Sequence, residues 1–137
     1  IPVIFWTGTG NTQMMADAVA EAINAAGAEA VVKNVSEISA DEAAGYDALA
    51  LGCPAMGAEV LEECEFEPFF TELEGKLAGK KVALFGSYGW GGSYMQDWEA
   101  RVKDAGATLV ADGVLALGAP DDEAMAKLAE AGKLLAE

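Results

Sequence analysis

Short apolar runs alternate with helix-like patterns along the whole chain, and this alternation constrains the fold more than any other feature. Strands that need burial and helices with one apolar face must pack on each other. The predicted strands are Pro2–Trp6, Glu29–Val35, Asp47–Gly52, Lys81–Gly86 and Thr108–Leu117, the last with a bend near Asp112–Gly113. The predicted helices are Asn11–Ala26, Ala40–Ala44, Pro68–Leu73, Ser93–Ala105 and Asp121–Ala136. Five such βα units, about 25 residues apart, predict an α/β fold with a doubly wound, five-stranded parallel sheet.

Individual residues mark the faces and ends of these helices. The first helix places Met14, Met15, Val19 and Ile23 near one side, at spacings of three to four residues. Pro68 suits the first position of its helix, where a missing N–H costs nothing. We therefore expect the four apolar side chains to pack on the sheet and the third helix to begin at the proline.

Length and composition are those of a globular domain. The chain has 137 residues, and we expect residues 1–137 to form a single domain around one core. Hydrophobic residues make up 53% and charged residues 23%, which excludes a disordered chain. No apolar run approaches ~18 residues and no basic segment opens the chain, so we expect neither a membrane span nor secretion. The expectation is a monomer in the cytoplasm.

The charge is strongly acidic. Lys and Arg number 8 against 23 Asp and Glu, giving a net charge of −15. This balance argues against nucleic acid and anionic membranes and favours basic partners. Acidity that only confers solubility remains an equally good explanation at this point.

The residues for protein-only chemistry are scarce. The chain has no histidine, which removes His-based acid–base catalysis, Ser-His-Asp triads and histidine metal sites. Cys53 and Cys64 lack CxxC spacing and are predicted to be reduced, buried thiols, so no metal site is expected. A bound cofactor is therefore the more attractive source of chemistry.

The loop after the first strand has the features of a phosphate cradle. It reads TGTGNT, comprising Thr7, Gly8, Thr9, Gly10, Asn11 and Thr12. Glycines let a backbone curl around an anion, hydroxyl and amide side chains add donors, and the helix that follows adds its dipole. The loop has neither the lysine of a Walker A motif nor the third glycine of GxGxxG. An ordinary capped turn is the alternative, and the flanking hydroxyl residues favour phosphate.

Two further loops follow the third and fourth strands. The first contains Pro54, Ala55, Met56, Gly57, Ala58 and Glu59, and the second contains Ser87, Tyr88, Gly89, Trp90 and Gly91. Taken alone, Met56 is better explained as a core plug, whereas Trp90 among glycines favours stacking on a flat ligand. Trp6 and Trp98 follow element patterns and are expected in the core. Together the three loops predict a site for a phosphorylated planar ring, and flavin mononucleotide (FMN) fits it.

These loops resemble those of the flavodoxin family. TGTGNT is similar to its phosphate loop, and PAMGAE and GSYGWG resemble the two flavin-flanking loops of its short-chain, clostridial-type members. The resemblance covers the whole chain. It implies a flavodoxin-like fold with the family's strand order 2-1-3-4-5, and FMN at the switch point of the sheet.

The resemblance also implies a role for each loop residue. Thr7, Thr9, Asn11 and Thr12 would hold the phosphate with backbone N–H groups of their loop. Met56 would cover the inner flavin face and Trp90 the outer. Glu59 would accept from the ring N3–H, the Gly89 backbone would meet the pyrimidine edge, and the Gly57 carbonyl would turn toward N5 on reduction.

The function implied is electron transfer rather than catalysis. The chain would be a low-potential, one-electron carrier that shuttles FMN between semiquinone and hydroquinone, serving basic, ferredoxin-type oxidoreductases. The acidic run Glu59, Glu62, Glu63, Glu65 and Glu67 would repel charge on the flavin and attract such partners, although a merely solvated face is the alternative. A small FMN-dependent reductase is the second hypothesis. A response-regulator receiver is excluded because the aspartates it needs are missing, and a low-mass phosphotyrosine phosphatase because the first loop lacks Cys and Arg.

Overall fold

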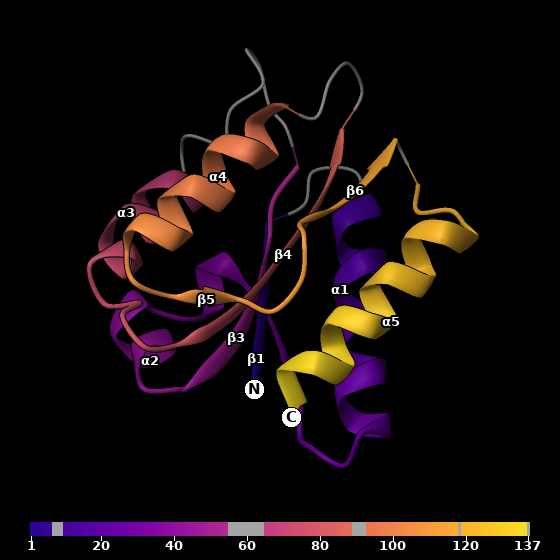
Figure 1. Cartoon of the computed structure of the whole chain (residues 1–137), viewed down its shortest axis with the longest axis horizontal. Helices are drawn as coiled ribbons and strands as arrows, with labels where there is room; N and C mark the ends of the chain where they lie inside the picture. Colours follow the sequence, from indigo (N-terminus) through magenta and orange to yellow (C-terminus); the bar gives the residue numbers. More distant parts are fainter. Residues whose placement is uncertain (7–9, 55–64, 89–92, 118, 137) are drawn as a thin grey trace.

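A parallel sheet runs through the middle of the molecule (Figure 1). The computed structural model describes residues 1–6, 10–54, 65–88, 93–117 and 119–136. In these segments the strands are β1 Pro2–Phe5, β2 Val31–Asn34, β3 Ala48–Gly52, β4 Lys81–Tyr88, β5 Thr108–Leu109 and β6 Val114–Leu117. They follow the order β2-β1-β3-β4-β5, with β6 also beside β4. The predicted order 2-1-3-4-5 is therefore confirmed.

The sheet has a switch point at β1. Phe5 lies beside Asn34 of β2 on one side and beside Gly52 of β3 on the other. The helix that follows β1 and the helix that follows β3 cover opposite faces of the sheet (Figure 1). In such sheets the crevice at the carboxyl ends of the strands, where the helices diverge, is where ligands bind.

The fifth predicted strand is interrupted where its sequence predicted a bend. β5 pairs with β4 as far as Val82–Leu109, and β6 resumes the pairing at Phe85–Val114. Four residues on one strand thus face two on the other. Gly113 ends the interruption: its N–H donates to Glu99 Oε2 at 2.9 Å, and a Cβ there would lie 2.4 Å from the Met95 sulfur. A glycine and a carboxylate acceptor therefore accommodate the break.

Helices cover both faces of the sheet. They are α1 Asn11–Ala25, α2 Ala40–Ala44, α3 Phe66–Glu74, α4 Ser93–Asp104 and α5 Asp122–Ala136, with a short 3-10 helix, η1 Val35–Glu37. In Figure 1, α1 and α5 pack on one side and α2, α3 and α4 on the other. No helix within the described segments is long and apolar enough to cross a membrane.

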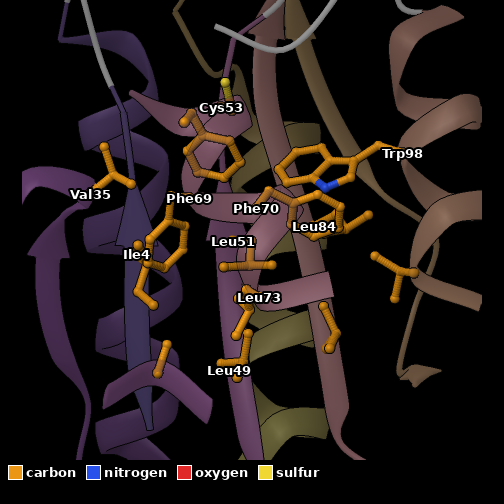
Figure 2. Close-up of a cluster of buried hydrophobic side chains, with 14 of the residues drawn as sticks. Ile4, Val35, Leu49, Leu51, Cys53, Phe69, Phe70, Leu73, Leu84 and Trp98 are labelled. Atoms are coloured by element: carbon orange, nitrogen blue, oxygen red, sulfur yellow. The ribbon is translucent and has the colours of Figure 1, made fainter. Parts of the chain in front are cut away.

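The period-two alternation of strand residues creates a core on each face. Ile4, Leu51 and Leu84 point toward α3 and α4, whereas their neighbours Val3, Phe5, Ala50 and Phe85 point toward α1 and α5. Figure 2 shows Ile4 beside Phe69, and Leu51 and Leu84 near Phe70. The Trp98 ring meets Phe66 and Phe70 edge to face, with centroids 5.4 and 5.9 Å away. Such contacts anchor α3 and α4 on the sheet.

Three local predictions were wrong. Met14 is 45% exposed, because the buried stripe of α1 is centred on Met15, Val19 and Ile23 and Met14 lies to one side of it. The third helix begins at Phe66, so Pro68 is its third residue, still within the first turn whose N–H groups have no intrahelical acceptor. The second strand ends at Asn34, whose side chain caps η1 by accepting from Ser36 N.

Candidate functional site

The first predicted loop runs into the N-terminus of α1. Gly10 precedes the helix with a φ of 91°, a left-handed conformation that glycine adopts readily. The first turn of α1 carries no acidic side chain, and Gly10 offers no side-chain cap. A helix N-terminus has partial positive charge and N–H groups without intrahelical acceptors, so this one suits an anion. Thr7, Gly8 and Thr9 lie outside the described residues.

Two buried hydroxyls bring the first and third predicted loops together. Thr12, in the first turn of α1, is 1% exposed, and Ser87, near the end of β4, is 6% exposed. Their Oγ atoms lie 3.4 Å apart. Each hydroxyl has one donor and two acceptor sites, so this contact uses only part of their capacity. The hydroxyls can therefore make further hydrogen bonds at the N-terminus of α1, where an anion is favoured. The phosphate of FMN would suit this position. Asn11 is the first residue of the same helix.

The second predicted loop leaves the sheet from a tightly packed corner at the end of β3. Cys53 and Pro54 are buried, and the Cys53 N–H donates to the Phe85 carbonyl at 3.1 Å. Cys53 is a buried thiol, as predicted. Ala55, Met56, Gly57, Ala58, Glu59 and Cys64 lie outside the described residues, so their predicted roles stay predictions.

The third predicted loop begins at Tyr88, the last residue of β4. Tyr88 is half-buried and packs against the core cluster beneath α3 and α4. Gly89, Trp90 and Gly91 lie outside the described residues. The contact of Ser87 with Thr12 therefore places the start of this loop beside α1, at the carboxyl end of β4.

A polar contact that the sequence did not reveal joins the flanks of the first two loops. Trp6 directly precedes the phosphate loop, and its Nε1–H donates to Glu65 Oε1 at 3.3 Å. Glu65 comes directly after the acidic loop that contains Glu62 and Glu63. Trp6 also packs partly against the core, as expected of it. Nothing local in the sequence signals this pairing, because the two residues are 59 positions apart.

One member of the acidic run, Glu67, forms an ion pair within the fold. Glu67 Oε1 lies 2.8 Å from Arg101 Nη1, and Glu74 lies 3.0 Å from Arg101 Nε. The guanidinium also stacks over Phe70, 4.7 Å from the ring centroid. Burial lowers the pKa of Arg101, but hydrogen bonds to Glu74 and Glu67 outweigh it and raise that pKa overall. Glu67 therefore serves the α3–α4 packing and contributes less to the acidic surface than the sequence predicted.

The described part of the site consists of hydroxyls, a helix end and strand termini. Within the described segments, no three Cys, Asp or Glu side chains gather closely enough to hold a metal ion. The helix end and the two hydroxyls fit a ligand with an anionic group, such as the phosphate of FMN.

Comparison with known proteins identifies the family. The family model for flavodoxin matches residues 3–132. The chain is 47% identical to a flavodoxin of Clostridium beijerinckii over 135 residues, covering 98% of this chain and 97% of the relative. It is also 47% identical to a flavodoxin of Megasphaera elsdenii over 116 residues, covering 84% of this chain and 85% of the relative.

The fold agrees with that of a solved relative. The solution structure of the two-electron-reduced Megasphaera elsdenii flavodoxin superimposes with a TM-score of 0.91 at 43% identity, covering 98% of this chain and 97% of the other. The family and the cofactor that the three loop motifs predicted are thereby confirmed. The chain belongs to the flavodoxin family and is an electron-transfer flavoprotein rather than an enzyme, with FMN as its cofactor.

Proposed function

We propose that this flavodoxin carries one electron at a time, at low potential, between ferredoxin-type oxidoreductases with basic docking surfaces. FMN, when bound, supplies the redox chemistry, while the protein sets the potential, the exposure of the ring and the choice of partner. The net charge of −15 supports basic partners, since opposite charge accelerates encounter and aligns the proteins. Acidic side chains near the ring would oppose further negative charge there, which favours a low potential.

The proposal includes the setting in which the protein works. Residues 1–137 would form one domain that acts as a cytoplasmic monomer. Its acidity disfavours contact with nucleic acid or anionic membranes.

Three loops would hold the cofactor. Thr7, Thr9, Asn11 and Thr12, together with the N–H groups of Gly8 and Gly10, would bind the phosphate. Met56 and Trp90 would cover the two faces of the ring. The polar edge of the ring would meet Glu59 and the Gly89 backbone. Pro54, Ala55, Gly57, Ala58, Ser87, Tyr88 and Gly91 complete the proposed contact set.

The observation that carries this site is the buried contact between Thr12 and Ser87. These residues come from two of the three predicted loops and are 75 positions apart in sequence. They meet at the N-terminus of α1, whose first turn carries no acidic side chain. The loop TGTGNT contains no lysine or arginine that could bind a phosphate. A buried hydroxyl pair at this place can instead donate hydrogen bonds to it.

The test separates the phosphate from the ring. Thr12→Val keeps the side-chain shape and removes the hydroxyl. Loss of a hydrogen bond to a charged group costs roughly 1.5–3 kcal/mol, so FMN should bind about 10–150-fold more weakly. Riboflavin, which has no phosphate, should bind almost as before. Thr71→Ala, at an exposed threonine of α3, is the control. Equal weakening of both flavins, measured by fluorescence titration of the apoprotein, would contradict the assignment.

A further inference from the structure

A buried phenol links the end of β3, where the loop carrying Met56 starts, to the first turn of α4, which follows the loop carrying Trp90. Tyr94 Oη donates to the Cys53 carbonyl at 2.8 Å. Tyr94 is 3% exposed and Cys53 is fully buried. The bond passes the backbone of Gly86 in β4, where a Cβ would lie 2.1 Å from Tyr94 Oη and 2.2 Å from the Cys53 oxygen. A side chain at position 86 would therefore separate the pair.

The bond fixes the direction in which the chain leaves β3. The Cys53 N–H is held by the Phe85 carbonyl, and the Cys53 carbonyl is held by Tyr94. The next residue is Pro54, whose ring confines its φ to about −65°. The peptide planes on both sides of Cys53 and the first torsion of Pro54 are thus set before the chain enters the loop that carries Met56.

The same side chain stands at the end of the other loop. Tyr94 is the second residue of α4, which begins at Ser93, directly after the loop that carries Trp90. Its hydroxyl reaches across β4 to the end of β3. One hydrogen bond therefore connects the last anchored residue before one loop with the first anchored turn after the other.

The phenol is a dependable donor. Burial, together with the nearby Cys53, raises the pKa of Tyr94, so its hydroxyl keeps its proton at any physiological pH. The acceptor is the carbonyl of the Cys53–Pro54 peptide, which is buried at the end of β3. Removing only this hydroxyl takes away one of the hydrogen bonds that orient this peptide, so the direction in which the chain leaves β3 should be less well defined.

We propose that Tyr94 is a positioning residue for the flavin site, which fixes the end of β3, before the loop carrying Met56, against the start of α4, after the loop carrying Trp90. This inference rests on the proposed function, in which these loops cover the two faces of FMN. Tyr94 acts through Cys53 and α4, outside the proposed phosphate loop, so its effect should be the same for flavins with and without a phosphate.

Tyr94→Phe tests the proposal, with Tyr46→Phe as the matched control at a tyrosine that is 43% exposed. Dissociation constants for FMN and riboflavin are measured by fluorescence titration of each apoprotein. We expect Tyr94→Phe to weaken both flavins by about tenfold, equivalent to about 1.4 kcal/mol, and to leave their affinity ratio unchanged. The potential of the FMN-loaded variant should also shift, whereas Tyr46→Phe should change neither quantity.

Other outcomes overturn the proposal. If Tyr94→Phe lowers the melting temperatures of the apoprotein and the FMN-loaded protein equally and leaves both flavin affinities unchanged, the hydrogen bond has only a structural role. If it weakens the binding of FMN but not of riboflavin, Tyr94 acts on the phosphate rather than on the ring. Trp90→Ala separates this failure from that of the proposed function. If Trp90→Ala weakens both flavins and Tyr94→Phe does not, only the role of Tyr94 is wrong; if neither variant does, the loop placement itself is wrong.

Discussion

Replacing Ser87 with alanine should weaken FMN binding and leave riboflavin binding almost unchanged. A hydroxyl has a single proton, so a Thr12 hydroxyl that donates to the phosphate must accept, not donate, in its contact with Ser87. That contact is 3.4 Å long and joins two neutral groups. A neutral hydrogen bond contributes roughly 0.5–1.5 kcal/mol, and its length places this one at about 0.5–1 kcal/mol, or about two- to fivefold in affinity.

A double-mutant cycle isolates this effect. The apoproteins of the parent, Ser87→Ala, Thr12→Val and the double variant are titrated with both flavins, and Ser36→Ala serves as an exposed serine control. The Ser87 hydroxyl contacts Thr12, so we expect the effect of this hydroxyl on the phosphate to pass through the Thr12 oxygen. Ser87→Ala should then cost nothing once Thr12→Val is present. The same loss of FMN affinity in both backgrounds would refute the reasoning, as would an equal loss for riboflavin.

Three further predictions follow from the acidic loop, the flavin turn and the core. Replacing Glu62, Glu63 and Glu65 with glutamine should raise the potential of the second reduction step, where 59 mV corresponds to about 1.4 kcal/mol, and should slow transfer to a basic partner at low salt only. Unchanged potentials and rates would show a merely solvated face. Gly57→Thr should lower the potential of the first reduction step and leave the affinity for oxidised FMN almost unchanged, because a turn that needs positive φ at this position disfavours a β-branched residue. An unchanged potential of the first step would rule out the proposed turn of the Gly57 carbonyl toward N5. Trp98→Phe should cost about 1–2 kcal/mol in urea denaturation, less than the roughly 3–5 of an alanine, since its buried N–H has no acceptor among the described residues. A loss as large as the alanine value would contradict this.

The sequence was sufficient for the architecture because its signals are local. Consecutive apolar residues such as Val3, Ile4 and Phe5 indicate a strand buried on both faces, and the glycines after the helices mark their ends. The break in the fifth strand was visible at Asp112–Gly113 because a glycine within a strand pattern indicates a bulge or bend. Loop motifs at the strand ends then indicated the cofactor.

The tertiary contacts around the site were not predictable in the same way. Tyr94 and Trp98 both satisfy a helix-face pattern, and nothing in that pattern shows that the Tyr94 hydroxyl reaches a carbonyl 41 positions away. The pairing of Glu67 with Arg101 spans 34 positions and turns a residue of the acidic run into a packing contact. Local periodicity predicts the helix face on which a side chain lies, but not the residue that it contacts in the folded protein.

The start of the third helix was misplaced for a related reason. Proline at the first helical position is a common signal, and Pro68 matched it. Phe66 nevertheless lies within the helix, where its ring is fully buried against Trp98. Burial of this aromatic ring outweighs the preference of the proline for the first helical position. The burial depends on Trp98, which lies 32 positions later and is not part of the local sequence pattern.

The central claim is that this flavodoxin transfers electrons singly through FMN. A potentiometric titration of the FMN-loaded protein, followed by its absorbance, tests that claim most directly. The account predicts two separate one-electron steps, the second at a lower potential because negative charge accumulates beside an acidic surface. A single step in which both electrons enter together would contradict it.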